Sequence, residues 1–193
     1  MTPKTTQRDK IIRATADLFR RQGYAATGLS DIVEKSRAPK GSLYHYFPGG
    51  KDEIAAVAVR YAGEKVRRTL EDLASSTQSP GDLLRSYGKL VAGWMAESGF
   101  RDGCPITTAI LETAPDKDDI AAAGKAAFTS WFDILEARLT ANGLNKKRAR
   151  ELSRLAIMAL EGALILARVE ASPAPILLAV NEVASLFERE CGA

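Results

Sequence analysis

The N-terminal fold of this chain is decided by residues 40–47, which read KGSLYHYF. Leu43 and Phe47 are four residues apart, so they share one face of a helix and are expected to anchor it in an apolar core. The other side chains of the stretch then point away from that core. They are a cation, hydroxyls and flat rings, which can contact the phosphates and base edges of a DNA major groove. Gly41 would let DNA approach the backbone closely.

Two helices are expected before this stretch, with a tight turn after each of them. Apolar residues recur at spacings of three and four in residues 6–22 and again in residues 29–36. Gly23 is placed to end the first helix with a left-handed cap, and Pro39 ends the second helix and opens the third. Three helices of these lengths over about residues 8–47 are typical of a helix-turn-helix DNA-binding motif.

This segment resembles the DNA-binding domain of the TetR family, the tetracycline-repressor-like regulators. The matching positions span roughly residues 8–55 and are Gly23-Tyr24, Thr27, Asp31-Ile32, the KGSLYHYF stretch and Lys51-Asp52-Glu53. Three positions depart from the family pattern. Gly28 replaces a capping threonine, Arg37 replaces a common turn glycine, and Pro39 replaces a capping serine or threonine. The wider stretch APKGSLYHYFPGGK, with Gly103-Cys104-Pro105, is most similar to the branch that includes repressors of drug-resistance and efflux genes.

The resemblance implies a homodimeric transcriptional repressor that binds a palindromic operator and is released by a small hydrophobic ligand. It implies a DNA-binding domain over residues 1–50 and a helical ligand-binding and dimerisation domain over residues 51–193. Resemblance and side-chain chemistry together predict nine DNA-contacting residues: Thr27, Pro39, Lys40, Gly41, Ser42, Tyr44, His45, Tyr46 and Lys51. Tyr44 and Lys51 are expected to touch phosphates. Packing against the first and fourth helices is the alternative for Tyr44 and Tyr46.

The rest of the chain is also expected to be helical, which makes the protein all-α with about nine helices. Six further helices are expected over about residues 51–74, 80–98, 105–113, 116–142, 146–171 and 173–190. Serine, proline or asparagine stands near several of their starts. The helix that begins near residue 80 is expected to turn a wide apolar face inward, with Leu90 and Trp94 on it.

This C-terminal part carries more large apolar residues than a simple bundle needs. Under the resemblance, we expect a cavity among the fourth to eighth helices that holds the effector. The predicted ligand-binding residues are Tyr61, Lys65, Trp94, Met95, Phe100, Cys104, Thr108, Phe128, Trp131, Phe132, Met158 and Glu161. Ordinary core packing is the alternative for each apolar member, and Glu161 and Lys65 could equally be solvated.

The last two expected helices are apolar around more than one face. The first of the two also carries small residues, such as Ala156, Ala159 and Gly162, that permit close helix approach. Pairing of both helices with their copies would form a four-helix dimer interface. A wholly intramolecular core is the alternative.

Charge is distributed unevenly along the chain. Residues 1–51 hold 10 Lys and Arg against 4 Asp and Glu, whereas the remainder holds 17 against 20. A basic head on a mildly acidic body indicates that the head meets a polyanion such as DNA. The basic run at residues 146–150 lies inside the acidic body, which favours a solvated face over a second DNA site.

Several classes of function are disfavoured by the sequence. No segment has the pattern of a signal peptide or the apolar length of a membrane span, which predicts a cytoplasmic protein without a membrane partner. His45 is the sole histidine, and Cys104 and Cys191 lack metal-ligand spacing, so neither a metal nor a cofactor is expected. Without a histidine or a nucleophile-base spacing in the body, an enzyme is not expected. A helix-turn-helix protein without an inducer, an activator, and a redox-sensing Cys104 remain alternatives.

Overall fold

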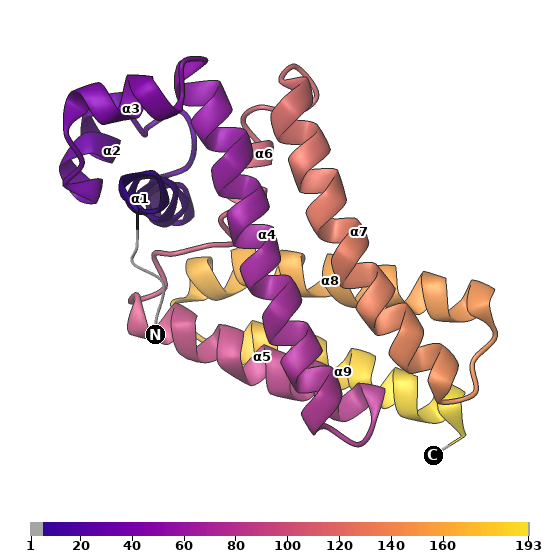
Figure 1. Ribbon diagram of the computed structural model, residues 1–193. Helices are drawn as coiled ribbons and strands as arrows, with labels where there is room; N and C mark the ends of the chain where they lie inside the picture. The colour runs from indigo at the N-terminus through magenta and orange to yellow at the C-terminus, as the bar shows by residue number, and fades with distance from the viewer. Residues whose placement is uncertain (1–5, 193) are drawn as a thin grey trace. The chain divides into compact units, whose positions relative to one another are not determined.

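The computed structural model describes residues 6–192, and in that range the chain forms nine α-helices and no strand (Figure 1). The helices are α1 (Gln7–Gln22), α2 (Leu29–Ser36), α3 (Lys40–Tyr46), α4 (Gly50–Ser76), α5 (Pro80–Glu97), α6 (Thr107–Ile110), α7 (Asp118–Ala141), α8 (Lys146–Glu170) and α9 (Ala174–Cys191). The predicted all-α class is confirmed. Eight helices lie within about two residues of their predicted bounds; α6 is shorter than predicted, and turns follow it to residue 116.

The chain divides into two compact units. The first comprises residues 6–64 and 104–127, and the second comprises residues 65–103 and 128–192. The long helices α4 and α7 therefore contribute residues to both units. The functional boundary expected after residue 50 falls at the start of α4, inside the first unit.

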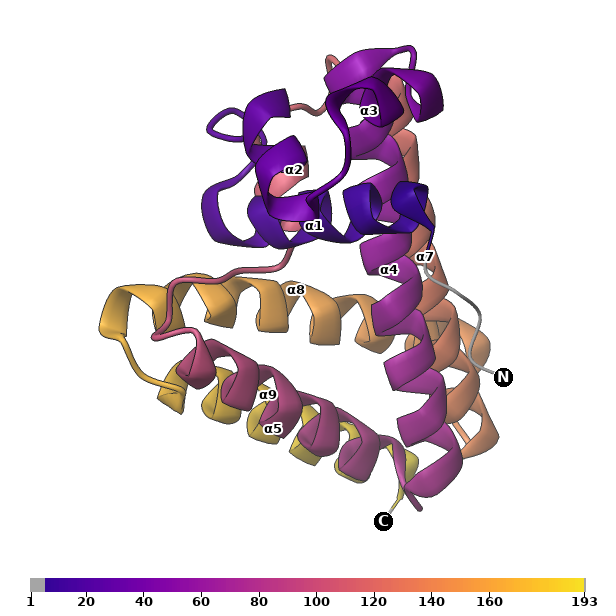
Figure 2. The same ribbon diagram turned by 60° about the vertical axis from the view of Figure 1, so that its left-hand side comes forward.

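In the first unit, α1, α2 and α3 group together around a small apolar core (Figure 2). The core cluster combines side chains of these helices, of the turn before α3 and of α4, all at most 5% exposed: Ile11, Ile12, Ile32, Ala38, Leu43, Phe47 and Ile54. Thr6 caps α1, since its hydroxyl accepts from the Asp9 N–H at 3.1 Å while Asp9 accepts from the Thr6 N–H at 3.0 Å. The helix-turn-helix is thus held by burial of one face of each short helix.

The turns of this unit depend on three residues. Gly23 ends α1 at φ +80° and ψ −176°, a backbone region reserved for glycine, rather than the left-handed cap predicted. The Thr27 hydroxyl donates to the Gly23 carbonyl at 2.7 Å, which closes the turn into α2. Gly28 caps α2, and its N–H donates to the Asp31 carboxylate at 2.7 Å.

In the second unit, α5 lies alongside α9 and α9 lies alongside α8 (Figures 1 and 2). Gly88 allows the α5–α9 approach, because a Cβ at this position would lie 2.5 Å from a methyl of Val180. Two cross-helix ion pairs add to the packing. Arg85 on α5 donates to Glu188 on α9, with Nη2 and Oε2 3.0 Å apart, and Arg148 on α8 donates to Glu190.

The predicted inward face of α5 is only partly correct. Leu83, Leu84 and Met95 are buried as expected, but Leu90 and Trp94 are 39% and 43% exposed. Because α5 is buried by α9 along a narrower stripe than its apolar sequence indicates, these two side chains stand at the edge of that stripe. None of the helices between residues 6 and 192 has both the length and the apolar content to cross a membrane.

Candidate nucleic-acid interface

The short helix α3 is fixed to the first unit by its apolar side chains. Leu43 and Phe47 are both 0% exposed, which confirms their predicted role as anchors. The Arg8 guanidinium lies 5.4 Å from the centre of the Phe47 ring, so α1 holds the end of α3 through a cation–π contact. A seven-residue helix is marginal by itself, and burial of these two side chains is what fixes its orientation.

The opposite side of α3 presents the predicted DNA-contacting groups to solvent. Lys40, His45, Tyr44 and Tyr46 are exposed, with Tyr44 at 51% and Tyr46 at 37%. The His45 and Tyr46 rings meet edge to face with centroids 5.0 Å apart. Pro39 and Gly41 are exposed as well, and Ser42 is half-buried. Seven of the nine predicted residues therefore lie in the segment formed by residues 39–46.

Thr27 and Lys51 lie apart from that segment. Thr27 is fully buried and its hydroxyl proton is donated to Gly23, so its side chain serves the turn. Lys51, at the start of α4, is half-buried, and its ammonium lies 4.1 Å from the centre of the Tyr24 ring. Burial lowers the pKa of Lys51 below its usual value.

Beside Lys51 lies a polar cluster that the sequence did not indicate. Lys117 forms an ion pair with Asp52 at 2.5 Å, and the Tyr24 hydroxyl donates to the other carboxylate oxygen. The pKa of Asp52 is lowered chiefly by the hydrogen bond from Lys117 and secondly by the one from Tyr24. The pKa of Tyr24 is raised chiefly by burial and secondly by its hydrogen bond to Asp52. This cluster ties the α1–α2 turn to the start of α4 and to the segment before α7.

A second set of contacts joins the α6 region to the end of α1. The Glu112 carboxylate accepts from the Ala25 N–H, and the Thr108 hydroxyl lies 2.8 Å from the Phe19 carbonyl oxygen. A Cβ at Gly23 would lie 2.1 Å from a Glu112 oxygen, which is the movable end of an exposed side chain, so the glycine is needed there for its φ rather than for space. Partners 87 and 89 residues apart leave no periodic signal in the sequence.

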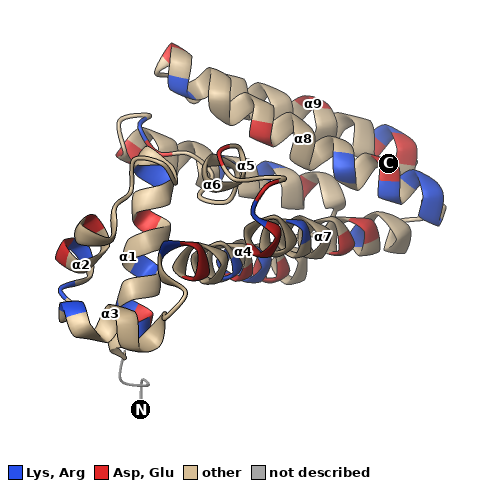
Figure 3. Cartoon of the chain, turned by 90° about the horizontal axis from the view of Figure 1, so that it is seen from above, with Lys and Arg blue, Asp and Glu red and all other residues tan. Residues whose placement is uncertain are grey.

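Lys and Arg residues occur along α1 and at the junction of α2 and α3, as the blue segments of Figure 3 show. Acidic residues on the same helices include Asp17, Asp31 and Glu34, but Asp31 is occupied in capping α2. The face around α3 is therefore basic and ring-bearing, which suits the phosphates of duplex DNA.

Two models of known protein families match the chain. The model described as bacterial regulatory proteins, tetR family, matches residues 11–58, and the model described as transcriptional regulator LmrA/YxaF-like, C-terminal domain, matches residues 80–182. The chain belongs to the TetR family. The resemblance read from the KGSLYHYF stretch and its surroundings is confirmed, and the C-terminal match assigns the protein to the LmrA/YxaF-like branch of TetR-family transcriptional regulators.

Curated relatives in the TetR family align over nearly the whole chain. The uncharacterised HTH-type transcriptional regulator YxaF of Bacillus subtilis is 32% identical over 98% of this chain and 100% of its own length. The HTH-type transcriptional regulator LmrA of the same species is 30% identical over 94% and 97%. A solved structure, the regulatory protein TetR from Rhodobacter sphaeroides, has a TM-score of 0.81 at 24% identity, over 91% of this chain and 96% of that chain, which shows a shared fold.

The predicted ligand-binding residues of this TetR-family chain are distributed over both units. Tyr61, Cys104 and Thr108 belong to the first unit and the other nine to the second. Met95 and Trp131 are buried, Lys65, Trp94 and Met158 are exposed, and the remainder are half-buried. The rings of Phe128 and Trp131 meet edge to face at 5.1 Å, and Phe128 and Phe132 stack at 6.4 Å.

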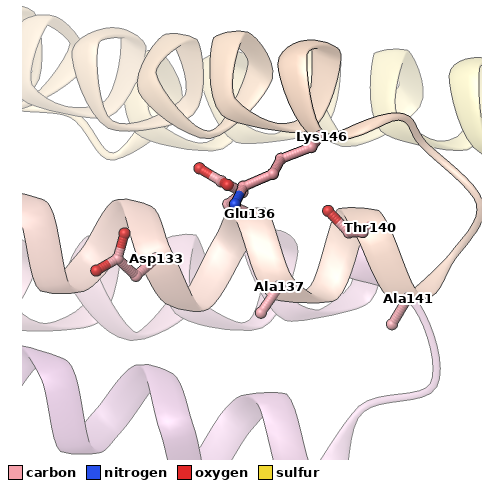
Figure 4. Close-up of a pocket in the computed structure, with 6 residues that line it drawn as sticks. All are labelled: Asp133, Glu136, Ala137, Thr140, Ala141 and Lys146. Atoms are coloured by element: carbon pink, nitrogen blue, oxygen red, sulfur yellow. The ribbon is translucent and has the colours of Figure 1, made fainter.

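A depression of about 540 Å³ lies on the second unit between α7 and the start of α8 (Figure 4). Its lining is largely exposed and consists of Asp133, Glu136, Ala137, Thr140, Ala141 and Lys146. None of the predicted ligand-binding residues lines it. Among residues 6–192, no group of three or more His, Cys, Asp or Glu side chains is arranged to hold a metal ion.

Proposed function

We propose that this TetR-family regulator is a cytoplasmic, non-enzymatic homodimer that represses transcription by binding a palindromic operator. The observation that carries this proposal is the division of α3 into two faces. Leu43 and Phe47 are 0% exposed, while Lys40 and the rings of residues 44–46 face solvent. A helix held in this way can enter a major groove without rearranging its own core.

Each exposed group is assigned a role by its chemistry. Lys40 and His45 are donors that can reach base edges, and Tyr44 and Lys51 are assigned to phosphates. Pro39, Gly41, Ser42 and Tyr46 supply supporting contacts. We leave Thr27 outside the contact surface, because its buried hydroxyl is already used by the turn.

A second copy of the chain is proposed to pair along α8 and α9. The outward face of α8 is apolar even though its inward face is also apolar and buried; its exposed members are Leu155, Met158, Ile165, Leu166 and Val169, at 39% to 78% exposure. Leu178 on α9 is 64% exposed. Large apolar side chains on neighbouring helices are typical of a dimer interface. In the dimer, the two α3 helices would occupy major grooves about 34 to 36 Å apart, or a multiple of that distance.

Release by a small hydrophobic ligand is the remaining part of the proposal. It is supported by the match to the LmrA/YxaF-like C-terminal domain and by the aromatic cluster of Phe128, Trp131 and Phe132. A ligand lowers operator affinity only by the ratio of its affinities for the two conformations of the protein. By the same resemblance, a gene for drug resistance or efflux is the proposed target.

The operator is best tested with duplexes selected from random DNA by the full chain. Saturable binding to a palindrome, weakening steeply with salt, is expected in fluorescence anisotropy. Lys40→Ala should weaken binding by about 1–3 kcal/mol, roughly fivefold to 150-fold. Lys147→Ala, which removes an exposed charge from α8, serves as the matched control. Equal losses in the two variants, or no selected sequence at all, would contradict the proposal.

A further inference from the structure

Arg37 occupies an unusual place between α2 and α3. It ends α2 in the left-handed region, at φ 53° and ψ 26°, and its N–H donates to the Glu34 carbonyl at 3.3 Å. Side chains with a Cβ rarely adopt this conformation, whereas glycine does so freely. Glycine would make the same backbone hydrogen bond, so the cap itself does not require arginine.

No contact within the described chain explains why position 37 carries an arginine side chain either. Arg37 is exposed, and its guanidinium forms no hydrogen bond or ion pair with any residue from 6 to 192. It is not stacked on a ring of the described part of the chain, unlike Arg8 over Phe47. The backbone strain at this position is therefore not offset by a contact of the arginine with its own protein.

The surroundings of Arg37 indicate what it meets outside the chain. Lys35 and Lys40 are exposed on either side of it in the sequence, and Glu34 is the one exposed acid between residues 32 and 46 of the described chain. Pro39 offers no hydroxyl to a phosphate where the α2–α3 turn enters α3. Figure 3 shows the basic residues at this junction. Arg37 thus joins Lys35 and Lys40 beside the helix assigned to the major groove, at a turn where the cap position carries no hydroxyl.

We infer that Arg37 is a further DNA-contacting residue, whose guanidinium binds a backbone phosphate of the operator beside the α2–α3 turn. The planar fork of arginine donates two parallel hydrogen bonds to phosphate oxygens, which fixes position as well as adding charge. Such a contact sets how deeply and at what angle α3 enters the groove. This inference rests on the proposed function and assigns a residue that lies outside the predicted set.

Three variants separate this role from a structural one. Arg37→Gly and Arg37→Asn remove the charge and relieve the left-handed strain, because glycine and asparagine tolerate that region. Arg37→Lys keeps both the charge and the strain. Each is measured by thermal unfolding and by anisotropy titrations of the selected operator and of a scrambled duplex over a range of salt concentrations.

The uncharged variants are expected to keep or gain thermal stability while losing DNA affinity. Arg37→Gly and Arg37→Asn should melt at or above the wild-type temperature, yet bind both duplexes roughly fivefold to tenfold more weakly at about 0.1 M salt, with a log–log salt slope smaller by about one. Arg37→Lys should retain the wild-type slope. A lower melting temperature for Arg37→Gly, or affinity and slope equal to wild type, would overturn the inference.

Two further outcomes are informative. A loss confined to the operator, with an unchanged slope, would mean that Arg37 reads a base edge, and the phosphate assignment would be wrong. If the wild-type chain binds no duplex at all, the proposed function fails before the Arg37 variants are compared, so the two failures are distinguishable.

Discussion

Single residues in the head decide turns, and glycine is used there in two different ways. Gly23 is required by the fold, since residues with a Cβ rarely adopt its φ of +80°. Gly41 is not required in this way. It lies in α3 with ordinary helical geometry, and a Cβ there would meet no heavy atom of the described chain within 4 Å. We therefore propose that this glycine, which the fold does not need, allows DNA to approach the backbone closely.

Gly41→Ala is therefore expected to act oppositely on folding and on binding. Alanine has the higher helix propensity, so the free energy of unfolding should rise by up to about 1 kcal/mol. Operator affinity should fall, because the methyl group stands between the backbone and DNA. Thermal unfolding and anisotropy measure the two effects. Gly93→Ala on α5, another exposed glycine with open space around it, should stabilise the protein and leave DNA affinity unchanged.

The outcome for Gly41 has a clear opposite. If Gly41→Ala binds the operator with wild-type affinity, the glycine has no role in DNA approach. If it lowers the melting temperature, the helix at this position is constrained by a contact that the structure does not describe.

At the scale of elements, the head is tied to segments far along the chain. Lys117, just before α7, reaches Asp52 at the start of α4, and Tyr24 from the α1–α2 turn donates to the same carboxylate. Glu112, which follows α6, accepts from the backbone of that turn. The position of Lys51, assigned to a phosphate, is therefore set by elements outside the three-helix motif.

The Asp52 cluster predicts a pH dependence of stability. The pKa of Asp52 is lowered in the folded state, mainly by the hydrogen bond from Lys117. The ionised Asp52 carboxylate therefore stabilises the fold fully above the unfolded pKa of about 3.9, and this stabilisation is lost as pH falls through the lower folded pKa. Because this side chain is 51% exposed, solvent screening keeps the contribution below about 1 kcal/mol.

Asp52→Asn should therefore melt slightly lower than wild type at pH 6, and the gap should close as pH falls below about 4. Thermal unfolding at pH 6 and pH 3 measures this. Lys117→Met should give the same pattern, because it removes the partner that lowers the Asp52 pKa. A gap that is equal at both pH values would show that the carboxylate does not titrate with folding.

For the molecule as a whole, the apolar outer face of α8 is the surface proposed to pair with a second copy of the chain. Met158 stands on that face with 61% of its surface exposed, and Val169 with 78%. Apolar area left in water is unfavourable by about 25 cal/mol per Å², so pairing with a second copy would recover free energy from these side chains. The inner face of the same helix already packs against α9.

Met158→Lys is expected to convert the dimer to a monomer at micromolar concentration, because an unpaired charge would be buried in the interface. Operator affinity should fall with it, since one head alone loses the gain from binding two half-sites together. Light scattering after gel filtration gives the mass. Thr129→Lys, at an exposed position of α7, is the control and should stay dimeric. A monomeric wild type would contradict the proposed pairing.

The helices, their approximate bounds and the two faces of α3 could be predicted from the sequence alone. These follow from short-range rules: the spacing of apolar residues, capping residues, and glycine or proline at the ends. For that reason the burial of Leu43 and Phe47 and the exposure of Lys40 and Tyr44 agree with the prediction, whereas contact of Lys40 and Tyr44 with DNA stays a prediction. The family followed from the same local pattern, because its motif lies within about fifty adjacent residues.

Features that depend on partners distant in the sequence became known only from the folded structure. It buried Thr27 under its own turn, left Leu90 and Trp94 of α5 exposed, and brought Glu112 and Lys117 to the head. Periodicity reports which face of a helix is apolar, but not how much of that face a neighbour covers. Contacts across 65 or 87 residues are set by how the helices pack, and no local pattern encodes them.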